Sequence, residues 1–179
     1  MPAAVESEIK LRVGRPEDAR AALAGLGAER VRARHFEDNV LFDDAASSLA
    51  SGGRVLRLRR TEAGGVLTHK APRSDRDGVK VRTELETAVG DPDALQAIVH
   101  ALGFRPVFRY QKYREVYRWK DVEIVVDETP IGAFLEIEGP VSAIHEAAAA
   151  LGYAPADYMR DSYVSLFFAA GGQGDMTFE

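Results

Sequence analysis

The stretch Val5-Glu6-Ser7-Glu8-Ile9-Lys10-Leu11-Arg12-Val13 alternates charged side chains with small or apolar ones. Successive side chains of a β-strand point to opposite faces, so Glu6, Glu8 and Lys10 would share one face. The small and apolar residues of the stretch would take the other face. The pattern predicts a strand with one charged face and one face suited to a core.

The same alternation recurs in at least five later segments. Their charged members are Arg57 and Arg59, Lys70, Arg82, Glu84 and Glu86, Lys112 and Arg114, and Glu136 and Glu138. Each strand could simply turn its charged face to water. The recurrence, and the clustering of charges by sign, favour instead a barrel whose charged faces enclose a polar interior. A basic wall would favour a polyanion, and clustered carboxylates would favour a hard cation such as Mg²⁺.

The positions of proline and glycine predict where the helices and strands begin and end. Helices are expected over 16–26, 92–102 and 141–151, each followed by glycine, with a fourth over 161–170. Strands are expected over 5–13, 34–42, 54–61, 66–70, 80–89, 107–119, 122–127 and 134–138, with Gly64-Gly65 as a hairpin turn. The order predicts an α+β domain over residues 1–170, an antiparallel sheet with helices packed outside, and a frayed tail over 171–179.

Composition excludes several classes of protein. The 179 residues include 28 acidic and 23 basic side chains, a net charge of −5, which argues against a nucleic-acid binder or a polybasic membrane anchor. The chain has no cysteine, so disulfides, thiolate metal sites and cysteine nucleophiles are excluded. Without a signal-peptide pattern at its start or a long apolar run, we expect a cytoplasmic protein, monomeric or homodimeric.

The motif Glu6-x-Glu8-x-Lys10 resembles the E-x-E-x-K signature of the CYTH superfamily, the triphosphate tunnel metalloenzymes. This group includes class IV adenylate cyclases and thiamine triphosphatases. The later charged segments, together with Thr68, Asp127 and the stretch 132–138, follow in the order of that family. The resemblance extends from Glu6 to about residue 164. It implies a closed eight-stranded antiparallel β-barrel, a tunnel, with helices packed outside.

The resemblance also implies roles for individual residues. A metal set for Mg²⁺ or Mn²⁺ would comprise Glu6, Glu8, Glu86, Asp127, Glu136 and Glu138. A triphosphate-binding set would comprise Lys10, Arg57, Arg59, Lys70, Arg82, Lys112 and Arg114. Glu6, Glu8, Lys10 and Glu84 would take part in catalysis. Periodicity alone does not single out Asp127, which lies at a strand end, where capping the next turn is an alternative role.

The function implied is metal-dependent hydrolysis of a small triphosphate, such as tripolyphosphate or ATP. Two alternatives stay open: a class IV adenylate cyclase that converts ATP to cyclic AMP and pyrophosphate, and a non-catalytic module that binds nucleotide or polyphosphate. Val55 stands where animal thiamine triphosphatases carry a tryptophan before the arginine pair, and this disfavours thiamine triphosphate.

Overall fold

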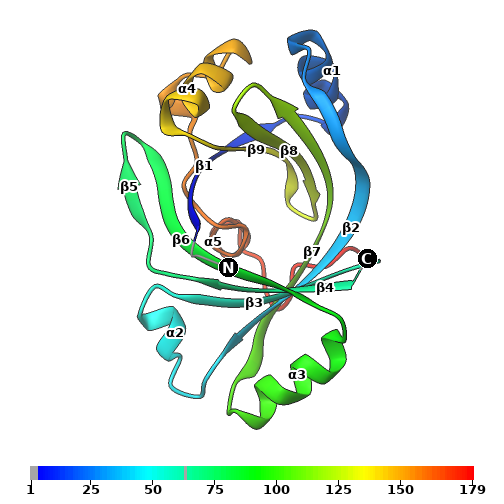
Figure 1. The fold of residues 1–179 in the computed structure, drawn as a ribbon, viewed down its shortest axis with the longest axis vertical. Helices are drawn as coiled ribbons and strands as arrows, with labels where there is room; N and C mark the ends of the chain where they lie inside the picture. Colours follow the sequence, from blue (N-terminus) through cyan, green and yellow to red (C-terminus); the bar gives the residue numbers. More distant parts are fainter. Residues whose placement is uncertain (1–3, 63) are drawn as a thin grey trace.

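The computed structural model describes residues 4–62 and 64–179 of the chain. In chain order, the elements of these residues are β1 (Ala4–Val13), α1 (Pro16–Leu26), β2 (Glu29–Asp43), α2 (Ser48–Ser51), β3 (Val55–Thr61), β4 (Gly64–Lys70), β5 (Ser74–Arg76), β6 (Val79–Val89), α3 (Pro92–Ala101), β7 (Arg105–Trp119), β8 (Val122–Thr129), β9 (Gly132–Glu138), α4 (Val141–Ala150), the 3₁₀ helix η1 (Pro155–Asp157) and α5 (Tyr163–Ala169) (Figure 1).

The strands close into a barrel. They pair in the order β1-β9-β8-β7-β2-β3-β4-β6, and β1 also pairs with β6, which joins the two ends of the sheet. Every pairing is antiparallel, and β5 extends the sheet only as a short partner of β6. Figure 1 looks down the resulting ring, with α1, α3 and α4 around its outside. The expected closed eight-stranded antiparallel barrel with outer helices is confirmed.

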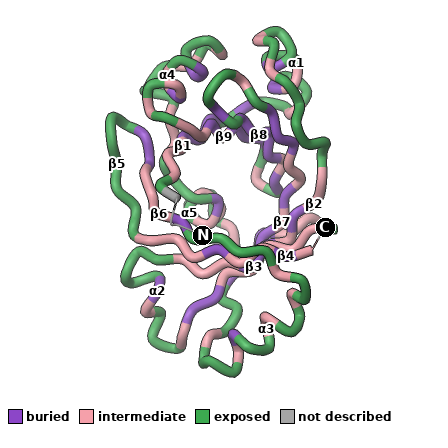
Figure 2. Tube along the Cα trace, viewed as in Figure 1, coloured by how far each residue is buried: buried purple, intermediate pink, exposed green. Residues whose placement is uncertain are grey.

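The apolar face of the barrel carries the main core. Ile9 and Leu11 of β1, fully buried, pack in one cluster with Leu23 of α1 and Ile144 of α4. Figure 2 shows buried residues along β8 and β9 as well. A smaller cluster joins Val99 of α3 to the outer faces of β2 and β3. The helices therefore cover the apolar face, as alternation requires, and the charged face is left to the interior.

The predicted helices agree closely with the structure, and the differences lie in turns. α1 spans the expected residues, and the Asp91 carboxylate caps α3 by accepting hydrogen bonds from the amides of Asp93 and Ala94. Gly64 and Gly65 belong to β4 rather than to the turn before it. The polar stretches 43–53 and 72–78, expected as loops, contain α2 and β5.

The end of the chain differs from the frayed tail that we expected. Met176 is fully buried, its amide donates to the carbonyl of Arg109, and its carbonyl accepts from the amide of Gln111. The Phe178 ring lies 5.3 Å from the Tyr113 ring. These two apolar side chains bring the segment onto β7, because burying them outweighs the backbone entropy that the glycines before them lose on ordering.

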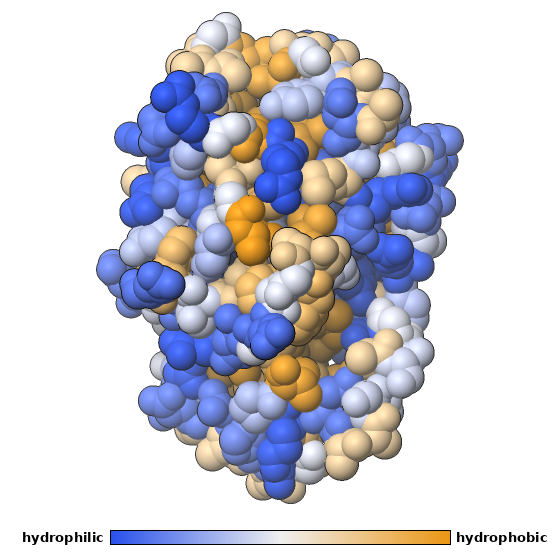
Figure 3. All heavy atoms as spheres, turned by 180° about the vertical axis from the view of Figure 1, so that it is seen from behind, coloured by the Kyte–Doolittle hydropathy of each residue, from blue (hydrophilic) through white to orange (hydrophobic). Residues whose placement is uncertain are grey.

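One face of the molecule is seen as a surface in Figure 3. Figure 3 shows one face, with hydrophilic side chains along its flanks and apolar ones scattered between them. Within residues 4–62 and 64–179, no helix combines the length and apolar character needed to cross a bilayer.

Candidate active site

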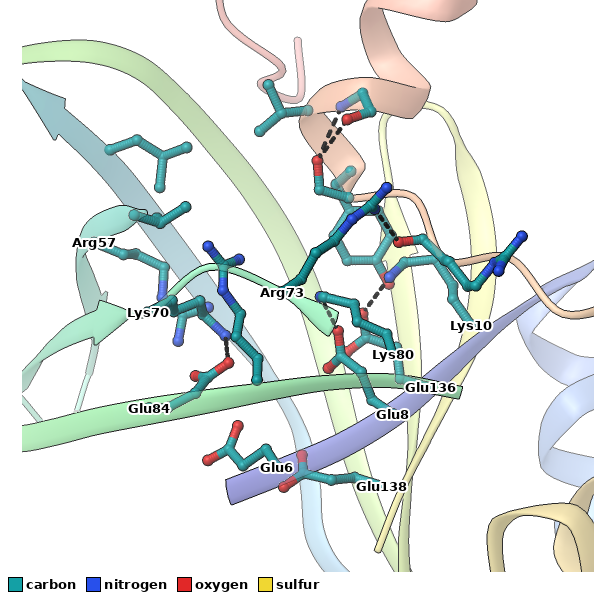
Figure 4. A pocket seen from close by; sticks show the side chains of 18 of the residues that line it. Glu6, Glu8, Lys10, Arg57, Lys70, Arg73, Lys80, Glu84, Glu136 and Glu138 are labelled. Carbon is teal, nitrogen blue, oxygen red and sulfur yellow. Dashed lines mark hydrogen bonds and ion pairs between the residues drawn. The ribbon is translucent and has the colours of Figure 1, made fainter. Parts of the chain in front are cut away.

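The barrel encloses a cavity of about 740 Å³. All eight barrel strands contribute side chains to its wall, and most of these side chains are charged (Figure 4). Residues 162–165, around the start of α5, also line the cavity, and Figure 1 shows α5 within the ring of strands. The interior is therefore a polar chamber rather than a packed core.

The strand register brings the predicted site residues together. Those that line the cavity are Glu6, Glu8, Lys10, Arg57, Arg59, Lys70, Arg82, Glu84, Glu86, Lys112, Arg114, Glu136 and Glu138. Asp127 is the one predicted site residue outside this wall. The period-2 sorting of charges thus predicts correctly which side chains share the interior, although position alone does not assign their roles.

Most interior cations have a carboxylate partner. Lys10 Nζ lies 2.7 Å from Glu136 Oε1, and Lys70 pairs with Glu84. Arg57 Nη2 lies 3.3 Å from an oxygen of Glu86, which also accepts a 2.6 Å hydrogen bond from the Thr68 hydroxyl. These pairs offset part of the cost of burying so many charges, and removing one partner would leave an uncompensated buried charge.

Asp127 lies behind the cations rather than on the cavity wall. Its carboxylate is fully buried, accepts two hydrogen bonds from Arg114, and lies 3.0 Å from Lys112 Nζ. The hydroxyl of Tyr163, from α5, donates to it at 2.8 Å. Asp127 is therefore a counterion of the β7 cations Lys112 and Arg114. The metal-ligand role implied by the resemblance stays a prediction.

Three further charged residues of the barrel strands, without an expected role from the sequence, lie in or beside this network. Lys80 lines the cavity and pairs with Glu8. Glu37 is 1% exposed, with carboxylate oxygens 3.6 Å from Arg59 and 3.7 Å from Lys112, and Glu123 lines the cavity from β8. Extending the i, i+2 alternation backward from Arg82 would have found Lys80.

Several carboxylates lie together on one side of the chamber. Glu8 and Glu138 are register partners across β1 and β9, and Glu138 and Glu123 are partners across β9 and β8. Figure 4 shows Glu6 and Glu138 near each other on the same side. Like charges on neighbouring strands oppose one another unless a cation or a proton intervenes.

The pKa values of two carboxyl groups show this repulsion. Burial, followed by the charge of Glu84, raises the pKa of Glu6 to about 7. Burial, followed by the charges of Glu6 and Glu8, raises the pKa of Glu138 to about 8. Glu8 behaves differently: its burial alone would raise its pKa, but Lys80 and other lysines hold that pKa below the ordinary value.

The carboxylates are of the right chemical type to bind a metal ion, but their side chains are not yet arranged around a common point. Their oxygens are the ligands that Mg²⁺ and Mn²⁺ prefer. In the part of the chain that the structure describes, however, no three His, Asp or Glu side chains form a ready metal-binding group. Glu8 is held by Lys80 and Glu136 by Lys10 and Arg114, which leaves Glu6 and Glu138 as the carboxylates with the most strongly raised pKa values.

Basic side chains lie together on the opposite side of the chamber. Burial, together with the charge of Arg57, lowers the pKa of Lys70 and of Arg59. Burial and several cations, with Arg57 and Lys112 foremost, act in opposite directions on Tyr110, and the cations lower its pKa overall. Positive charge is therefore dense on this side of the chamber, which favours binding of a polyanion.

A closed antiparallel barrel with cations on one interior side and carboxylates on the other defines a class of charged-tunnel proteins. The family model of the CYTH domain matches residues 4–163. The chain belongs to the CYTH domain family.

Known proteins resemble the chain over most of its length. A candidate adenylate cyclase of Methanocaldococcus jannaschii is 29% identical over 143 residues, which cover 79% of this chain and 81% of the relative. Among solved structures, a candidate adenylate cyclase from Vibrio parahaemolyticus superposes with a TM-score of 0.81 at 19% identity, covering 93% of this chain and 99% of the other.

A plant protein shares the fold as well. A candidate adenylyl cyclase from Hippeastrum, described as having a dominant triphosphatase activity, superposes with a TM-score of 0.69 at 23% identity, covering 94% of this chain and 97% of the other. At these identities the two structural likenesses establish the fold.

Proposed function

We propose that the protein is a divalent-metal-dependent enzyme that hydrolyses inorganic or organic triphosphates inside the barrel. The observation that carries this proposal is one enclosed chamber in which a basic wall faces a row of carboxylates. Membership of the CYTH family supports it. A chamber built only to bind a polyanion would gain little from so many carboxylates, because they repel phosphate unless a cation lies between them.

The basic wall would bind the phosphate chain. Arg57 and Arg59 project from β3 beside Lys70 of β4, and Lys112 and Arg114 project from β7. Guanidinium groups present paired donors that match phosphate oxygens, and lysines add compact charge. Binding would draw the side chains away from carboxylate partners such as Glu86 and toward the phosphate oxygens.

Glu6, Glu8 and Glu138 would hold Mg²⁺ or Mn²⁺. When bound, such an ion neutralises charge on phosphate oxygens and orients the attacking water. We assign Glu86, Glu136 and Asp127, which also belong to the metal set implied by the resemblance, to a different role. Each of these three already contacts an arginine of the basic wall, so each would orient that arginine. Glu8 pairs instead with Lys80, which lies outside the basic wall.

A carboxylate must accept the proton that the attacking water loses. Glu84 is 4% exposed, pairs with Lys70 of the basic wall, and its charge helps to raise the pKa of Glu6 on the acidic side. It thus connects the two sides of the chamber. We propose Glu84 as the group that receives this proton, with Lys10 stabilising the phosphate charge nearby.

A second reaction is favoured by one comparison, since the Methanocaldococcus relative carries the name of an adenylate cyclase. In that reaction the ribose 3′-hydroxyl of ATP attacks the α-phosphate and expels pyrophosphate. The deciding experiment incubates the protein and Mg²⁺ or Mn²⁺ with tripolyphosphate, ATP or thiamine triphosphate and separates the products. Release of inorganic phosphate supports the triphosphatase, and cyclic AMP with pyrophosphate supports the cyclase. Binding without turnover would support a non-catalytic module.

A further inference from the structure

Arginines surround the mouth of the chamber, outside the basic wall that would bind a triphosphate. Arg54 precedes β3, Arg73 lies in the loop after β4, and Arg160 lies in the segment before α5. All three side chains line the cavity, and all three residues are exposed. We refer to Arg54, Arg73 and Arg160 as the mouth arginines. Figure 4 shows Arg73 among the residues that line the cavity.

Hydrogen bonds connect the loops that form the mouth of the chamber. Arg82 donates one hydrogen bond to the carbonyl of Gly53, at 2.6 Å, and another to the carbonyl of Ala71. It thereby ties the loop before β3 to the loop after β4. Arg73 donates to the carbonyl of Arg160 at 3.2 Å, which ties the second loop to the segment before α5.

That last segment is itself anchored to the barrel. Met159 exchanges two backbone hydrogen bonds with Lys10 of β1, of 3.1 Å and 2.8 Å. A few residues later, Tyr163 bonds to Asp127 inside the barrel. The backbone of Arg160 is therefore held between two fixed points beside the mouth.

The partners of the mouth arginines differ from those of the interior cations. Arg54 donates to the carbonyl of Ser48, and Arg73 to that of Arg160. Arg160 lies 3.5 Å from Asp75, with both side chains about half exposed, where such a pair is weak. Most interior cations contact carboxylates, whereas Arg54 and Arg73 donate to neutral carbonyl oxygens and Arg160 has one weak, exposed carboxylate partner.

A substrate that extends from the interior toward solvent would pass these arginines. A nucleoside would gain most from an aromatic ring on which its base could stack. The aromatic residues that line the cavity are Tyr110 and Tyr163, and their hydroxyls are engaged inside by Arg57 and Asp127. A further phosphoryl group, in contrast, would meet guanidinium donors directly.

We propose that the mouth arginines form an additional anion subsite, and that the preferred substrate class is linear inorganic polyphosphate longer than three units. This inference deepens the proposed function and rests on it. The chain end would occupy the interior, and the fourth phosphoryl group would lie among Arg54, Arg73 and Arg160.

The test measures binding of tripolyphosphate and tetrapolyphosphate by calorimetry in EDTA, where turnover does not interfere, and hydrolysis of both with Mg²⁺. We expect the wild-type protein to bind the longer chain about tenfold more tightly, which corresponds to about 1.4 kcal/mol. The double variant Arg54→Gln/Arg73→Gln should bring this ratio close to one. The control Arg30→Gln/Arg32→Gln, on exposed positions of β2, should keep it.

The possible outcomes separate this inference from the function on which it rests. Equal affinities for both chains in the wild type, or an unchanged ratio in the double variant, would overturn the subsite even if tripolyphosphate is hydrolysed. A length-dependent ratio without turnover of either chain would keep the subsite and overturn the enzyme. If ATP binds more tightly than tetrapolyphosphate and loses that advantage in the double variant, the mouth arginines bind a nucleoside, and the polyphosphate proposal is overturned. The single variants Arg54→Gln and Arg73→Gln give the same readouts should the double variant unfold.

Discussion

Arg114 and Asp127 form a bidentate ion pair within the barrel wall, with Nε–Oδ1 at 2.7 Å and Nη2–Oδ2 at 2.6 Å. The two residues are register partners on β7 and β8, so the pair follows directly from the strand alignment. The same carboxylate contacts Lys112 and Tyr163. One buried side chain thus orients two cations of the basic wall and fixes the start of α5.

Replacing Asp127 should destabilise the fold. Asp127→Asn removes the buried carboxylate that Arg114 and Lys112 share, and leaves them only Glu136 and the more distant Glu37. Breaking such a buried pair costs about 3–5 kcal/mol. Urea unfolding monitored by circular dichroism measures the loss. Glu146→Gln, which breaks an exposed pair with Lys120, should cost less than about 1 kcal/mol. A stable Asp127→Asn protein whose only defect is weaker metal dependence would instead make Asp127 a metal ligand.

The acidic side of the chamber should make the metal-free protein less stable at high pH. The pKa of Glu138 is about 8 in the folded protein, against an ordinary value of 4.5. Between these pH values the folded state keeps a proton that the unfolded state has released, so the free energy of unfolding falls as pH rises through this range. Glu6, with a pKa of about 7, acts in the same direction.

Thermal unfolding in EDTA between pH 5 and pH 9 measures this dependence. Glu138→Gln, which cannot ionise, should flatten the decline and should be more stable than the wild type at pH 9. Glu146→Gln serves as the exposed control and should keep the wild-type slope. An unaltered slope in Glu138→Gln would show that Glu138 is already ionised in the folded protein.

Arg59→Ala should weaken triphosphate binding more than diphosphate binding. Arg59 lies on the basic wall with its pKa lowered by burial and by Arg57, which indicates that its charge is incompletely offset. We expect a loss of about tenfold or more for tripolyphosphate, since a charge-assisted contact to phosphate is removed. Competitive binding of tripolyphosphate and pyrophosphate measures it. Equal losses for both would mean that Arg59 does not contact the terminal phosphoryl group.

Glu8→Gln should raise the metal concentration needed for half-maximal activity by about tenfold or more, because one charged oxygen ligand is lost. The variant should still fold, since the amide can keep a hydrogen bond to Lys80. Titration of activity with Mg²⁺ tests it, with circular dichroism as the check on folding. Full activity of Glu8→Gln at the wild-type metal concentration would remove Glu8 from the metal set.

Local patterns in the sequence predict a large part of this structure. Alternation assigns Glu8 and Arg57 to the interior because side-chain direction in a strand depends only on residue parity. Proline and glycine locate α1 and α4 because their backbone preferences are local. The closed eight-stranded barrel, in contrast, was predicted only from the family resemblance, because strand order depends on contacts between residues distant in the sequence.

The remaining features depend on packing that no local pattern records. Asp127 shares the parity of the interior, yet Arg114 and Lys112 keep it off the cavity wall. The docking of Met176 on β7 requires a complementary surface from distant strands and from α5. The mouth arginines lie in loops, where alternation carries no information.

Phosphorus NMR of tripolyphosphate incubated with the protein and Mg²⁺ tests the central claim most directly, since it resolves substrate, pyrophosphate and phosphate in one spectrum. The account predicts conversion of tripolyphosphate to pyrophosphate and phosphate, abolished by EDTA and strongly slowed in Arg59→Ala. An unchanged tripolyphosphate spectrum with either Mg²⁺ or Mn²⁺ at the concentrations that bind the protein, or hydrolysis that persists in EDTA, would contradict it.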